Sequence, residues 1–93
     1  MIYTVTTLTA DSIKSRCLGY FNDLSLAVRA VETNALDMQE NYYWYAVIEE
    51  VGDGLYFFPR REWWFRWNRK ENKYVAIDKK PGKFNRIVCF GIG

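Results

Sequence analysis

The chain has 93 residues, a length that suits one domain with a small core. Hydrophobic residues make up 49% of it, which excludes a disordered chain, and no stretch approaches the roughly 20 apolar residues of a membrane helix. The net charge is only +2, but it is unevenly divided. Residues 1–58 carry three basic and eight acidic side chains and residues 59–93 carry ten and three, so the two parts have charges of −5 and +7. Such asymmetry is typical of a basic binding face.

Histidine is absent, which removes Ser-His-Asp and Cys-His nucleophile activation and most zinc sites. The adjacent carboxylates Glu49 and Glu50 point to opposite faces of a strand and cannot converge on one substrate. One of them could meet Asp53 or Glu62 across a hairpin, but the simpler interpretation is that both are solvated near a strand end. The sequence therefore predicts no enzyme, no metal site and no cofactor.

The N-terminal residues, MIYTVTTLT, lack the basic segment and the continuous apolar run of a signal peptide. We therefore expect a cytoplasmic protein with no membrane partner, in which Cys17 and Cys89 are reduced thiols. Both lie in strand-like runs, so we expect two small buried side chains. A disulfide between the terminal strands is the alternative.

Residues 2–8 alternate and are rich in β-branched side chains, which predicts a first strand; residues 16–21 form a second. Asp23 can cap a helix, because its carboxylate accepts the free amides of the first turn. The helix should end near Asn34, which tolerates left-handed geometry. Residues 37–41 are a polar connection or one more helical turn. The apolar stripe of the helix follows the spacing i, i+3, i+4, i+7, i+11 and consists of Leu24, Ala27, Val28, Val31 and Ala35.

Most of the aromatic residues, including all four Trp, lie between Tyr42 and Ile77. Residues 42–51 have apolar side chains on both faces, which predicts a central strand covered on both sides. Gly52-Asp53-Gly54 is a hairpin signal before a strand at 55–58, which Pro59 should end. Residues 63–67 and 74–77 then flank a polar turn and form a further hairpin.

Residues 78–83 are a charged turn, and residues 87–92 read as a last strand. The predicted order is β-β-α-β-β-β-β-β. We therefore predict an α+β single domain over residues 1–93, with one amphipathic helix packed on a twisted, mostly antiparallel sheet.

Basic residues are interleaved with aromatic residues in the stretch RREWWFRW, at residues 60–67. The period of a strand places Trp63, Phe65 and Trp67 on one face, which we expect to be core. Trp64 and Arg66 fall on the other face, which could be wet. The alternative is that Trp64 is core as well and that Arg66 covers an aromatic ring as a cation–π lid.

The run YYWYAVIEEVGDGLY, the helix before it and the ending VCFGIG resemble a family of small uncharacterised proteins from Gram-positive bacteria and their mobile elements. The likeness covers nearly the whole chain. Its motifs are core and turn signals, so it transfers no functional residues. It implies a cytoplasmic accessory protein linked to phages or plasmids, for which a regulator or an inhibitor of host defence is one role.

The leading hypothesis is a non-catalytic module that binds another protein, because Trp, Tyr and Arg are the residue types that anchor interfaces. The predicted binding residues are Arg60, Arg61, Trp64, Arg66 and Arg69. The alternative is single-stranded nucleic-acid binding by the same strand and the turn at 79–83, since cations neutralise phosphates while rings stack on bases. The acidic part of the chain could also face a basic groove on a partner, as a mimic of nucleic acid would.

Overall fold

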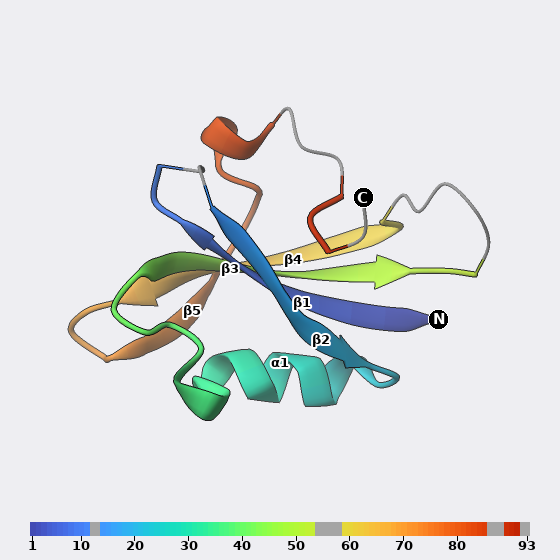
Figure 1. Cartoon of the computed structure of the whole chain (residues 1–93), viewed down its shortest axis with the longest axis horizontal. Coiled ribbons are helices and arrows are strands. Elements are labelled where there is room, and N and C mark those ends of the chain that lie inside the picture. The colour runs from blue at the N-terminus through green and yellow to red at the C-terminus, as the bar shows by residue number, and fades with distance from the viewer. Residues whose placement is uncertain (12–13, 54–58, 86–88, 92–93) are drawn as a thin grey trace.

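A computed structural model describes residues 1–11, 14–53, 59–85 and 89–91. Within these ranges the chain forms five strands, one α-helix and two short 3-10 helices, which confirms the α+β architecture (Figure 1). Their bounds are β1 Ile2–Thr9, β2 Ser15–Phe21, α1 Leu24–Glu32, η1 Ala35–Asp37, β3 Tyr43–Val51, β4 Arg61–Asn68, β5 Lys73–Ile77 and η2 Gly82–Phe84.

The strands form one sheet in the order β2-β1-β3-β4-β5, and every neighbouring pair is antiparallel. β3 lies in the middle of the sheet, and all of its residues except Trp44 are buried. Apolar residues on both faces of this segment therefore did indicate a central strand. β1 and β2 pair in antiparallel fashion, and the pairing of β4 with β5 confirms the hairpin predicted from residues 63–67 and 74–77.

The single α-helix begins and ends where its capping residues predict. The Asp23 carboxylate accepts a hydrogen bond from the Ser25 backbone N–H at 2.8 Å, which satisfies one free amide of the first turn. Ala27 and Val31, on the predicted stripe, are completely buried. Asn34 adopts left-handed geometry, with φ and ψ both 50°, and ends the regular helix.

α1 covers one face of the sheet (Figure 1). Side chains from alternate positions of the strands meet it there, including Val5, Ile48 and Phe65. Tyr74 of β5 completes this core: it is buried, and its hydroxyl donates a hydrogen bond of 2.8 Å to the Tyr43 carbonyl. Burial raises the pKa of Tyr74.

The opposite face is covered by η2 and residues 89–91, which together we call the C-terminal segment (Figure 1). Phe84 is completely buried there, against Tyr45 of β3 and Trp64 of β4. Residues 89–91 are not in a strand, so the predicted strand at 87–92 is wrong at these positions. Residues 87, 88 and 92 of that predicted strand lie outside the described residues, as does the whole of the strand predicted at 55–58.

The two cysteines differ in their surroundings. Cys17 on β2 is exposed, which contradicts the expectation that it is buried, and Cys89 is half-buried. They are not joined in a disulfide. None of the helices in the described ranges is long and apolar enough to cross a membrane.

Candidate binding surface

The five predicted binding residues fall into three different places, and the first of these is the core. Trp64 is only 4% exposed. Phe84 stacks on its ring with centroids 5.3 Å apart, and Phe90 meets the ring edge-on at 5.2 Å. The prediction that Trp64 forms part of an exposed surface is therefore wrong. The strand period placed it correctly on the face opposite α1, but residues from the far end of the chain cover that face.

Arg60 and Arg61 lie at the start of β4. The Arg61 guanidinium donates to the Glu50 carboxylate at 2.9 Å and 3.3 Å and lies 5.0 Å from the centre of the Trp63 ring. This hydrogen bond lowers the pKa of Glu50. The Arg60 backbone N–H donates to the Glu50 carbonyl at 2.8 Å. Arg61 is thus neutralised by its own chain, and it stands about seven residues, or roughly 23 Å, from the other end of the strand.

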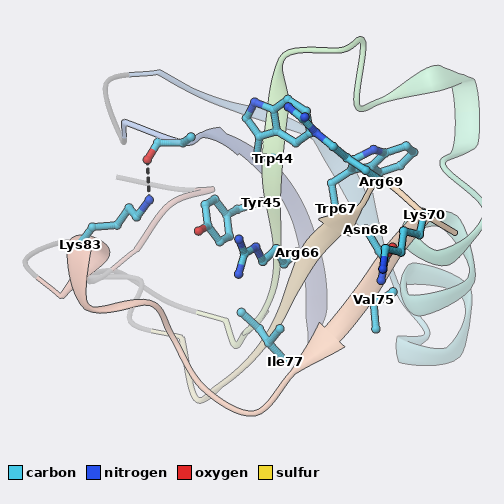
Figure 2. Close-up of a pocket in the computed structure, with 11 residues that line it drawn as sticks. Trp44, Tyr45, Arg66, Trp67, Asn68, Arg69, Lys70, Val75, Ile77 and Lys83 are labelled. Atoms are coloured by element: carbon cyan, nitrogen blue, oxygen red, sulfur yellow. Dashed lines mark hydrogen bonds between the residues drawn. The ribbon is translucent and has the colours of Figure 1, made fainter. Parts of the chain in front are cut away.

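Arg66 and Arg69 come together at that other end, in an open hollow of about 870 Å³ (Figure 2). β3, β4, β5 and the turn between β4 and β5 supply most of its lining, and Ala10 after β1 and Lys83 of η2 complete it. The lining residues are Ala10, Trp44, Tyr45, Arg66, Trp67, Asn68, Arg69, Lys70, Val75, Ile77 and Lys83. We call this feature the cationic hollow.

The cationic hollow is positive throughout. Four of its lining residues, Arg66, Arg69, Lys70 and Lys83, are basic and exposed, and no lining residue is acidic. Of the described residues, none makes a hydrogen bond, ion pair or cation–π contact with the Arg66 side chain, so its guanidinium is available to a ligand. A concave surface lined by charges of one sign raises the local concentration of ions of the opposite sign. The hollow is therefore suited to a negatively charged ligand.

Two of the aromatic rings in the hollow carry a cation over one face. The Arg69 guanidinium lies 4.7 Å from the centre of the Trp44 ring, and Figure 2 shows its side chain reaching across that residue. Lys83 lies 4.9 Å from the centre of the Tyr45 ring and donates a hydrogen bond of 2.7 Å to the Ala10 carbonyl. The cation–π lid expected of Arg66 is therefore not found among the described residues, and Arg69 and Lys83 cover aromatic rings in its place.

Trp44 and Tyr45 were not among the residues predicted for the surface, whereas Lys83 belongs to the turn at 79–83 that was predicted for nucleic-acid binding. Trp44 and Tyr45 are on β3, which pairs with β4 so that Tyr45 lies opposite Arg66. An antiparallel pairing of the two strands in this register would have predicted that Trp44 and Tyr45 lie close to Arg66. Lys83 enters from η2, and its place in a charged turn did not indicate that it would lie over Tyr45 of β3.

A second polar site lies on the same face, at the opposite end of β3 from Tyr45. Glu49 is completely buried, and its carboxylate accepts hydrogen bonds from the backbone N–H groups of Phe90 and Gly91 at 2.9–3.0 Å. Glu62 lies opposite it on β4 and accepts a hydrogen bond from the Trp64 indole at 3.0 Å. Burial raises the pKa of Glu49. Glu49 and Glu50 are both buried, so the expectation that they are solvated is wrong.

Glu49 therefore has a structural explanation as the anchor of the C-terminal segment. Its oxygens face backbone amides and not an open pocket. Among the described side chains, no group of three or more His, Cys, Asp or Glu is arranged to hold a metal ion.

The fold and the hollow together define a small α+β protein with an exposed cationic and aromatic surface at one end of its sheet. No protein-family model, curated protein or solved structure matches the chain. The resemblance to small proteins of Gram-positive bacteria and their mobile elements stays a prediction.

Proposed function

We propose that the protein is a non-catalytic interaction module and that its cationic hollow binds an acidic segment of another protein. The observation that supports this proposal is the lining of the hollow, in which four exposed cations surround partly buried aromatic rings without one carboxylate. Arg and Trp are the residue types that contribute most to protein interfaces. A regulator or an inhibitor carried by a mobile element is a role that such a module would suit.

The chemistry of the cations favours carboxylates as the groups bound. A guanidinium can form two parallel hydrogen bonds to one carboxylate, and Arg66 has no competing partner among the described residues. The partly exposed side chains of Val75 and Ile77 offer apolar contact beside the charges. Charge would speed the encounter, and the aromatic and apolar contacts would supply much of the affinity.

Single-stranded nucleic acid is the second candidate, because the same cations would neutralise phosphates. Binding of this kind also needs open ring faces on which bases stack. Arg69 and Lys83 cover faces of Trp44 and Tyr45, so a base would have to displace them. This contact favours the protein partner over the nucleic acid.

The test compares a labelled glutamate-rich peptide with labelled oligothymidine at low salt, by fluorescence anisotropy. We expect the peptide to bind more tightly, and its binding to weaken as salt is added. The double variant Arg66→Ala/Arg69→Ala should lose about tenfold or more in affinity for the peptide, equivalent to about 1.4 kcal/mol. The matched control is Arg29→Ala/Arg60→Ala, which removes the same charge from exposed positions outside the hollow.

Equal losses in the two double variants would show that net charge, and not the hollow, attracts the peptide. Tighter binding of oligothymidine would favour the nucleic-acid candidate. Absence of binding to either ligand would remove the hollow as the functional site.

A further inference from the structure

The sheet has two edge strands, β2 and β5, and they differ in regularity. The pairing of β2 with β1 shifts between Val5 and Thr6, where the register skips Leu18. Irregularities of this kind twist an edge away from would-be partners. β5 pairs with β4 in one continuous register over its whole length, from Lys73 to Ile77, and among the described residues β4 is its only neighbour. The regular edge is therefore the better template for a further strand.

β5 also borders the cationic hollow. Val75 and Ile77 line the hollow, whereas Tyr74 and Ala76 point to the face that carries α1. Ala76 is exposed, so α1 does not block the approach to this edge. A strand added beyond β5 would lie about 4.8 Å away and would alternate in the same manner. Every second side chain of that strand would then lie beside the hollow.

The charges around β5 decide which kind of strand fits. Arg69, Lys70 and Lys73 are exposed in and after the turn that joins β4 to β5, against one acidic residue, Glu71. A second copy of the chain paired through β5 would add the same excess of cations and leave the positive charge around this edge uncompensated. Carboxylates on the incoming strand would instead be attracted.

We propose that β5 is a docking edge, to which an extended acidic segment of a partner protein adds as a further strand, with alternate carboxylates over the cationic hollow. Backbone hydrogen bonds to β5 would supply affinity, and the hollow would select for carboxylates. This inference rests on the proposed function and names the form in which the partner binds.

The experiment uses a short synthetic peptide of alternating Glu and Val and two analogues of it. In a strand, the N–H groups of alternate residues point to the same side. One analogue is N-methylated at every Glu and the other at every Val, so each loses the N–H groups of one side only and keeps all its charges. We expect one analogue to bind at least about tenfold more weakly than the parent peptide and the other to bind nearly as tightly.

A second measurement locates the contact on the protein. Hydrogen exchange followed by NMR should show slower exchange of β5 amides when the parent peptide is bound, with no change in β2. Because the changes are made in the peptide, the protein and its fold are the same in every arm.

If both analogues bind as tightly as the parent, the edge makes no backbone bonds and the inference is overturned, while the proposed function stands. If the parent peptide does not bind, the inference and the proposed function both fail. If the protein forms a dimer through β5 and does not bind the peptide, then this edge is an interface between two copies of the chain, which also overturns the inference.

Discussion

At the scale of single residues, Leu36 in η1 has a strained backbone conformation. Its backbone is left-handed, with φ 54° and ψ 25°, a conformation that costs an L-residue roughly 1–2 kcal/mol. Asn34 and Asp37 share this conformation, but their short polar side chains tolerate it better. The Leu36 side chain is fully exposed at 101%, so no burial compensates for the strain.

Leu36→Gly should therefore stabilise the protein. Glycine removes the roughly 1–2 kcal/mol of left-handed strain. It also gives the unfolded chain more freedom, which costs about 0.4–1 kcal/mol of stability. The free energy of unfolding should therefore rise by about 0.5 kcal/mol. The matched control is Leu26→Gly on α1, where the leucine is 51% exposed and helical, and where glycine should cost about 1 kcal/mol or more. Urea denaturation measures both. A loss at both positions would show that Leu36 is not strained in solution.

At the scale of elements, residues 89–91 are attached to the sheet by the Glu49 carboxylate and by the Phe90 ring, which contacts Trp64. Glu49 on β3 accepts from the N–H groups of Phe90 and Gly91. Gly91 approaches β1 so closely that a Cβ there would lie 2.7 Å from Thr4 Oγ1, so only glycine fits. Burial raises the pKa of Glu49 and outweighs the hydrogen bonds from the Phe90 and Gly91 N–H groups, which lower it; the nearby Glu62 raises the pKa further, and Lys80 lowers it. The anchor is therefore a buried acid whose charged form is disfavoured.

Glu49→Gln tests this anchor through its pH dependence. Because the folded-state pKa is raised, the contribution of Glu49 to stability is greatest below the ordinary value of 4.5 and is lost as the pH rises through the folded value. The amide oxygen of glutamine can still accept hydrogen bonds and carries no charge. We therefore expect the stability of Glu49→Gln, relative to wild type, to improve as the pH rises from 4 to 8 in urea denaturation.

Glu50→Gln is the control with the opposite sign. The hydrogen bond from Arg61 lowers the pKa of Glu50, so its contribution is present above the ordinary value and is lost as the pH falls through the folded value. Glu50→Gln should lose stability relative to wild type as the pH rises. The same trend in both variants would contradict the assigned environments.

Local signals predicted the elements, and long-range contacts were the part that could not be predicted. The cap at Asp23, the turn at Asn34 and the apolar stripe between them depend on neighbours within a few residues, and all three are confirmed. The strand expected at 87–92 is wrong at 89–91 because amides there bond to the Glu49 side chain, more than 40 residues away. No pattern in a single sequence shows such a partner.

The same limit applies to the candidate site. Alternation along β4 correctly separated Trp63, Phe65 and Trp67 from Trp64, but it could not show which face would be covered, and by what. The cover over Trp64 comes from Phe84 and Phe90, at the other end of the chain. Of the five predicted binding residues, only Arg66 and Arg69 therefore reach the same hollow.

At the scale of the whole molecule, the described residues cover the two faces of the sheet in different ways. α1 and η1 cover one face with many apolar side chains. On the other face, Phe84 provides the centre of the cover. Its ring lies within 5.3 Å of those of Tyr45 and Trp64 and 6.1 Å from that of Phe90, measured between centroids. Of the aromatic side chains that the structure describes outside the sheet on that face, Phe84 is the one that is completely buried.

Phe84→Ala should cost about 3–5 kcal/mol of the free energy of unfolding, since it removes a buried ring and leaves a cavity. Domains of this kind have only about 5–15 kcal/mol in total, so the loss should be evident in urea denaturation. Tryptophan emission should also shift to longer wavelength, because Trp64 becomes wet. Phe84→Leu is the control, for which we expect a smaller loss and little spectral change.

The same substitution links the cover to the binding surface. Lys83 precedes Phe84 in η2 and lines the cationic hollow, held there by its hydrogen bond to the Ala10 carbonyl. If Phe84 holds η2 against the sheet, then Phe84→Ala should also weaken binding of the glutamate-rich peptide, whereas Phe84→Leu should not. Full peptide affinity in a destabilised Phe84→Ala protein would show that the hollow is formed by β3, β4 and β5 alone, without the C-terminal segment.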